Sequence, residues 1–85
     1  MNSGLRLSSE QIRAARMLLR WEQNDLATAS SVSLPTVKRL ETQPGDLRAS
    51  EKTIEGFHRA LEAAGVEFIA ANGGGPGVRL RKGQA

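Results

Sequence analysis

The chain has 85 residues, of which 39% are hydrophobic and 25% charged, and it carries a net charge of +3. This length predicts one small domain, and the moderate positive charge permits a polyanionic partner without requiring one. The absence of cysteine excludes disulfides and thiolate metal sites, and a single histidine gives no basis for a metal centre or a cofactor. No segment has the apolar length of a signal peptide or a membrane span, so we expect a cytoplasmic protein without a membrane partner.

The segment LSSEQIRAARMLLRW predicts a first helix. Ser8 or Ser9 can cap its start, since a serine hydroxyl accepts a hydrogen bond from a free backbone N–H of the first turn. Ile12, Ala15 and Leu19 recur on one face at helical spacing. This face is expected to pack against the core.

A second, shorter helix is predicted over EQNDLATAS, where Leu26 and Ala29 have helical spacing. The next residues, SVS, are too small and polar to continue it, apart from Val32. They predict a tight turn of three residues. A short helix, a tight turn and a further helix are therefore expected in succession.

The third helix is predicted from Leu34 to about Glu41, with Ser33 as its cap and with Val37 and Leu40 as its buried pair. Pro35 then takes the second helical position, where the N–H that proline lacks would have no partner in the helix. Because proline fixes its own φ, the start of this helix is expected to be stiff.

The opposite side of the third helix is short and cationic. At about 100° per residue, Lys38 and Arg39 point outward when the apolar pair points inward, and they can reach guanine edges and phosphates. Leu34, Pro35 and the Thr36 methyl can touch thymine methyl groups. An exposed Lys–Arg pair is by itself usually a solvated surface, so the helix–turn–helix context is what favours a binding surface. The outward set is Pro35, Lys38, Arg39 and Thr42, with Leu34 and Thr36 on its flanks.

A loop follows over TQPGDLRAS, and Arg48 in this loop is placed to reach a phosphate. Ser50 caps a fourth helix, EKTIEGFHRALEAAG, whose apolar positions include Phe57 and Leu61. Gly65 stands where a left-handed residue ends a helix.

Beyond that helix the pattern changes to the alternation of strands. VEFIA and VRLR, separated by ANGGGPG, predict a β-hairpin. An isolated hairpin is marginal in water, so its apolar side needs a partner. This partner is either the chain's own fourth helix or the hairpin of a second subunit. We favour the second, a homodimer built from the fourth helix and the strands. The expected dimer residues are Val66, Phe68, Val78 and Leu80.

WEQNDLATASSVSLPTVKRLE resembles the Cro/lambda-repressor-type (XRE-type) helix-turn-helix regulators, and IRAARMLLRW extends the likeness. LEAAGVEFI and NGGGPGVRLR resemble the tail of a compact bacterial subgroup. The resemblance, over roughly residues 5–82, implies a mainly α chain: a four-helix helix-turn-helix domain with a C-terminal β-hairpin. The implied organisation is an N-terminal arm (1–8), the helix-turn-helix domain (9–65), the hairpin (66–82) and a tail (83–85).

The resemblance also implies roles at matching positions. Gln23 matches the family's phosphate-contacting glutamine, and Arg39 a position often used to read bases. Arg16 and Glu41 match a partly buried, structural salt bridge. The candidate DNA-contacting residues are Gln23, Ser33, Leu34, Pro35, Thr36, Lys38, Arg39, Thr42 and Arg48.

The chain departs from the family pattern at two positions. Glu22 stands where serine, threonine or asparagine is usual, so the second helix loses a capping hydroxyl and gains an anion near the expected phosphate path. Ser31 replaces the usual glycine of the turn, which predicts backbone strain of up to about 1 kcal/mol.

Our leading hypothesis is a nucleoid-associated transcriptional regulator, a repressor or self-regulating controller. It would bind double-stranded DNA as a dimer, on an inverted repeat whose half-sites lie about one turn (~34 Å) apart. The alternative is an antitoxin or anti-activator that uses the same shape on a regulatory protein partner, which Glu22 supports. An enzyme is not expected, because the chain has no cysteine, no paired acid and histidine, and no nucleotide loop.

Overall fold

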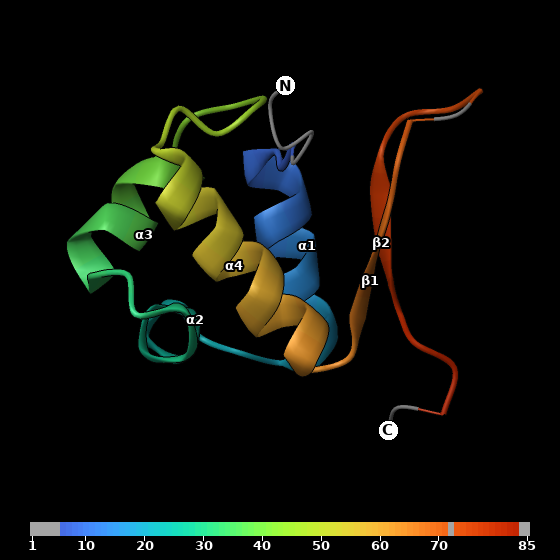
Figure 1. Ribbon diagram of the computed structural model, residues 1–85, viewed down its shortest axis with the longest axis horizontal. Helices are drawn as coiled ribbons and strands as arrows, with labels where there is room; N and C mark the ends of the chain where they lie inside the picture. The colour runs from blue at the N-terminus through green and yellow to red at the C-terminus, as the bar shows by residue number, and fades with distance from the viewer. Residues whose placement is uncertain (1–5, 72, 84–85) are drawn as a thin grey trace.

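The computed structural model describes residues 6–71 and 73–83, so parts of the predicted arm and tail lie outside the described residues. Four helices are followed by an antiparallel hairpin, which confirms the expectation of a mainly α chain with a C-terminal hairpin (Figure 1). No helix among the described residues is both long and apolar enough to cross a membrane. The elements are α1 (Ser9–Leu19), α2 (Gln23–Ser30), α3 (Leu34–Glu41), α4 (Glu51–Ala63), β1 (Val66–Ile69) and β2 (Gly77–Leu80).

Serine caps begin three of the four helices. Ser8 precedes α1 and forms a capping box with Gln11: each side chain accepts the other residue's backbone N–H at 3.0 Å. Ser33 and Ser50 accept in the same way from the third residue of α3 and α4. Of the two caps considered for α1, Ser8 is the one used, and the predicted caps of α3 and α4 are confirmed.

The hydrophobic core lies where α1, α2, α3 and α4 meet. Ile12 and Ala15 are buried as predicted, and Leu19 packs at the core's margin. On α2, Leu26 is buried but Ala29 is exposed, and Ala27 and Ser30 are buried instead. The fully or nearly buried apolar set is Leu7, Ile12, Ala15, Leu26, Ala27, Val37, Leu40, Leu47, Phe57, Ala60, Leu61 and Val66.

Leu7 and Ser8, just before α1, are buried in the fold, whereas the sequence placed both of them in an arm over residues 1–8. Leu7 is buried, and its carbonyl accepts a hydrogen bond from the Leu47 N–H at 2.9 Å. Ser8 forms an isolated antiparallel bridge with Asp46. This pairing ties the loop between α3 and α4 to the N-terminal end of α1.

A glycine allows α2 and α4 to approach closely. A Cβ at Gly56 would lie 3.0 Å from the Ser30 carbonyl oxygen, so the position has little room for a side chain. Gly65, just after α4, has φ 109°, a conformation that other residues adopt only with strain. The predicted role of Gly65 in ending the helix is thereby confirmed.

The hairpin packs on its own chain. The register pairs Val66 with Leu80 and Phe68 with Val78, which places the four apolar side chains on one face, against the core. The strands contact α1 and α4, and Gln11 Nε2 of α1 donates to the Gly77 carbonyl at 3.1 Å. Val66 is 0% exposed, so it is unavailable for the dimer contact assigned to it from the sequence.

Candidate functional site

Helix α3 is built as the sequence predicted. Ser33 Oγ accepts the Thr36 N–H at 3.3 Å, and Pro35 occupies the second helical position. Val37 and Leu40 are buried in the core. The helix is therefore fixed along one side and stiffened at its start.

The other side of α3 faces away from the protein. Lys38 and Arg39 are exposed, as is the cap residue Ser33. Thr42 ends the helix, and its hydroxyl donates to the Arg39 carbonyl at 2.7 Å. We call the following residues the α3 outer face: the exposed Pro35, Lys38, Arg39 and Thr42, and the partly exposed Leu34 and Thr36.

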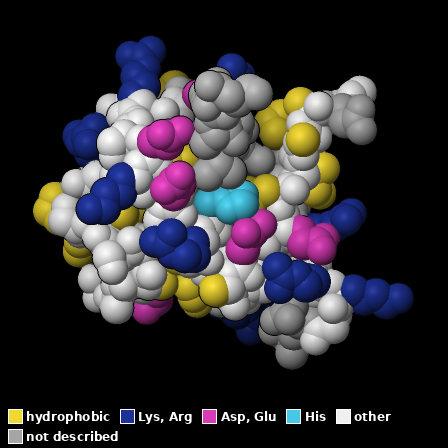
Figure 2. Space-filling view, in the orientation of Figure 1, with side chains coloured by type: hydrophobic (Ala, Val, Ile, Leu, Met, Phe, Trp, Pro, Cys, Tyr) yellow, Lys and Arg dark blue, Asp and Glu magenta, His cyan; other side chains and the backbone are white. Residues whose placement is uncertain are grey.

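The cations around α3 are free of acidic partners. Among the described residues, no carboxylate lies within 4.0 Å of Lys38, Arg39 or Arg48, whereas Arg13 and Arg79 each have one. Figure 2 shows Lys and Arg side chains along the side of the molecule where Figure 1 places α3. The positive charge there is thus available to an external anion.

A largely buried ion pair joins the end of α1 to the end of α3. Arg16 Nε and Nη2 donate to the two Glu41 carboxylate oxygens at 2.8 and 2.7 Å, and Arg16 Nη1 donates to the Trp21 carbonyl at 3.0 Å. The two charged side chains are 12% and 4% exposed. Ser9 of α1 also donates its hydroxyl to the Glu41 carbonyl. The salt bridge implied by the resemblance is therefore present, and it holds the end of α3 to α1.

Gln23, the expected phosphate contact on α2, takes part in the same network. Its Nε2 donates to Glu41 Oε1 at 2.9 Å, and the side chain is partly buried. An amide nitrogen has two N–H donors, so one remains for an external acceptor. The structure thus adds an internal role that the sequence did not predict.

The start of α2 compensates for its missing capping hydroxyl. Glu22 is the cap residue, and its backbone N–H donates to Asp25 Oδ2 at 2.8 Å. In a capping box, the side chain of the third helical residue accepts the backbone N–H of the cap residue. The place of Asp25 at the third helical position was therefore a sign of this bond in the sequence.

The turn between α2 and α3 carries the strain that its sequence predicts. Ser31 has φ 60°, in the left-handed region, and is exposed. Val32 is partly buried and packs against the core. The turn therefore keeps the shape that glycine usually provides, with a hydroxyl added.

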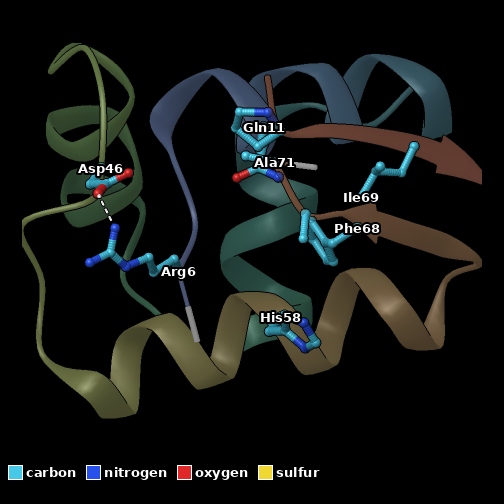
Figure 3. A pocket seen from close by; sticks show the side chains of 9 residues that line it. Arg6, Gln11, Asp46, His58, Phe68, Ile69 and Ala71 are labelled. Atoms are coloured by element: carbon cyan, nitrogen blue, oxygen red, sulfur yellow. Dashed lines mark ion pairs between the residues drawn. The ribbon is translucent and has the colours of Figure 1, made fainter. Parts of the chain in front are cut away.

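A separate hollow of about 610 Å³ lies between the hairpin, α4 and the residues before α1 (Figure 3). The His58 ring stacks on Phe68 with centroids 4.8 Å apart, and Arg6 lies 3.8 Å from Asp46. Gln11 points into the hollow, but both ends of its amide are already bonded within the chain. This arrangement supports the packing of the hairpin.

The described residues contain no group of three or more His, Asp or Glu side chains placed to hold a metal ion. Comparisons with protein-family models, curated proteins and solved structures found no match for this chain.

Proposed function

We propose that this chain is a sequence-specific regulator of transcription that binds double-stranded DNA by inserting α3 into the major groove. The observation that carries the proposal is that α3 has one buried apolar side and one exposed cationic side. Val37 and Leu40 are buried, while Lys38 and Arg39 project outward without an acidic partner among the described residues. A major groove admits one α-helix, whose outward side chains then meet base edges.

The surroundings of α3 fit a helix-turn-helix. Three residues separate α2 from α3, and Figure 1 shows α2 end-on beneath α3. In this motif the first helix crosses the DNA backbone while the second reads the groove. The Arg16–Glu41 pair fixes the end of α3, so its outer face is presented in one orientation.

The proposal assigns different tasks to the basic side chains. Arg39 reads a base, and a bidentate contact to guanine discriminates by about 1–3 kcal/mol. Phosphates are contacted by Lys38, Arg48 and Gln23. Each phosphate that a cation neutralises adds roughly 0.9 to the slope of the logarithm of affinity against the logarithm of salt concentration. Such a regulator would act at the nucleoid.

We further propose that two copies bind an inverted repeat, since a two-fold dimer presents two recognition helices to matching half-sites. With Val66 buried, Phe68, Val78 and Leu80 keep partial exposure at the hairpin. The spacing of half-sites in selected DNA tests this part of the proposal.

The experiment is selection of bound sequences from random DNA, followed by titration of the recovered site and a scrambled duplex. Arg39→Ala should weaken the recovered site by about 1–3 kcal/mol and bring the two duplexes closer in affinity. Arg79→Ala, which removes an equal charge from the hairpin, is the control. An Arg39→Ala protein with unchanged preference would contradict the assigned role.

The alternative is a module that uses the same surface on a protein. Glu22 favours it, because this exposed acid lies at the start of α2, beside the expected phosphate path. Mobility-shift assays at low salt separate the two functions. A pure protein-binding module would show no duplex binding at micromolar concentration.

A further inference from the structure

A second hollow, of about 320 Å³, lies between the α2–α3 turn and α4. Its wall includes Gly56, where the two helices approach closely, and Val32 of the turn. The remaining wall is polar, with hydroxyl groups from α2, the turn, α3 and α4 and two cations from α4. The polar residues that matter here are Ser31, Ser33, Thr36, Lys52, Thr53 and Arg59.

The two cations of this hollow come from one side of α4. Lys52 and Arg59 are seven residues apart, which is close to two turns, so both face the same way. Both are exposed, and within the described part of the chain neither has a carboxylate within 4.0 Å. Glu55 lies between them in sequence but does not line the hollow. The pair is therefore free to hold an anion.

Ser31 gives an independent reason to regard the hollow as a site. It is a non-glycine residue at φ 60°, and its hydroxyl has no hydrogen-bond partner among the described residues. Glycine would hold this backbone conformation without the steric cost. Strained residues concentrate at functional positions, and here the strain places a free hydroxyl beside two free cations.

We infer that this hollow binds a phosphate of the DNA backbone, an inference that rests on the proposed function. Lys52 and Arg59 supply charge and the hydroxyl of Ser31 supplies a donor, which together match a phosphodiester anion. Thr36 belongs both to the hollow and to the α3 outer face. The DNA strand that borders the groove entered by α3 would therefore be the nearest source of an anion. A DNA phosphate is for this reason favoured over an acidic peptide.

The test measures duplex affinity across a salt series for Lys52→Gln, Arg59→Gln and the double variant. Each single variant should weaken the recovered and the scrambled duplex alike. The double variant should lower the salt slope by about 0.9, the contribution of one phosphate, and each single variant should lower it by part of that amount. Arg79→Gln is the matched control, because it removes the same charge from the hairpin, on the side of the molecule opposite α3 (Figure 1). Its slope should remain that of the wild type.

Ser31→Gly separates a binding role from a structural one. Relief of the left-handed strain should raise the melting temperature, while loss of the hydroxyl should weaken duplex binding. A glycine variant that gains stability and keeps full affinity would remove Ser31 from the site.

The outcomes distinguish the two proposals. If the wild type binds duplex and the hollow variants keep its slope, as Arg79→Gln does, the phosphate site is wrong and the proposed function stands. If the wild type binds no duplex at low salt, the proposed function fails. If the wild type binds an acidic protein but no duplex, and the hollow variants lose that binding, the hollow belongs to the protein partner and the inference is overturned.

Discussion

Replacing Arg16 by methionine tests how much the fold depends on the ion pair at the end of α3. Methionine keeps an unbranched apolar stem but removes the guanidinium. The Glu41 carboxylate, whose side chain is 4% exposed, would then keep one hydrogen bond, from Gln23, of the three it accepts in the wild type. Breaking a buried pair in this way costs about 3–5 kcal/mol.

That loss is large for this chain. At roughly 0.05–0.15 kcal/mol per residue, 85 residues give a total stability of about 4–13 kcal/mol. Urea unfolding followed by circular dichroism measures the difference, and the melting temperature should fall by more than 10 °C, since ~1 kcal/mol shifts it by about 4–8 °C in a domain of this size.

Two further variants identify the origin of the loss of stability. Arg79→Met breaks a pair of similar length, Arg79–Glu67 at 2.8 Å, but one that is exposed, and it should cost less than about 1 kcal/mol. Arg16→Met combined with Glu41→Met removes the unpaired charge and should recover much of the stability. A single-variant loss below about 1 kcal/mol, or a double variant no better than the single, would refute the reasoning.

The remaining predictions concern packing and pH. Leu7→Ala should destabilise the fold by about 2–5 kcal/mol in urea unfolding, because Leu7 is buried in the core; a loss near zero would show that residues 6–8 detach freely. Gly56→Ala should lower stability, since the clash with the Ser30 carbonyl costs about 1–3 kcal/mol against a helix-propensity gain of about 1; a stabilised variant would mean that α2 shifts easily. Hydrogen bonds from the backbone N–H groups of Glu10 itself and of Gly45 lower the pKa of the Glu10 carboxyl below 4.5. Its stabilising contribution is therefore present above pH 4.5 and lost as the pH falls through the lowered pKa, so the melting temperatures of wild type and Glu10→Gln should converge in acid. A constant difference between the two proteins would contradict this.

Much of the local structure could be read from the sequence. The caps at Ser33 and Ser50, the inward placement of Val37 and Leu40, and the hairpin all follow from short patterns that act within one element. The Arg16–Glu41 pair came from the family resemblance, because the two positions lie 25 residues apart and no local pattern joins them.

What the sequence did not predict depends on contacts between distant segments. Leu7 precedes the first helix and has no periodic neighbours, yet the pairing of Ser8 with Asp46 brings it into the core. Ala29 has the spacing of a buried residue, but the face of α2 that meets α4 is set by the close approach at Gly56. The hollow beside the turn was missed for the same reason, since α4 supplies its cations.

The hairpin lies on the far side of α1 and α4 from α3, as Figure 1 shows. A twin molecule attached to the outward surface of this hairpin would hold its own α3 at the opposite pole of the pair. Such a pair would hold its two α3 helices farther apart than a pair joined through a surface near α3. A long spacing between half-sites in the selected DNA would therefore assign the contact to the hairpin, and a spacing of about one turn would assign it to a surface nearer to α3.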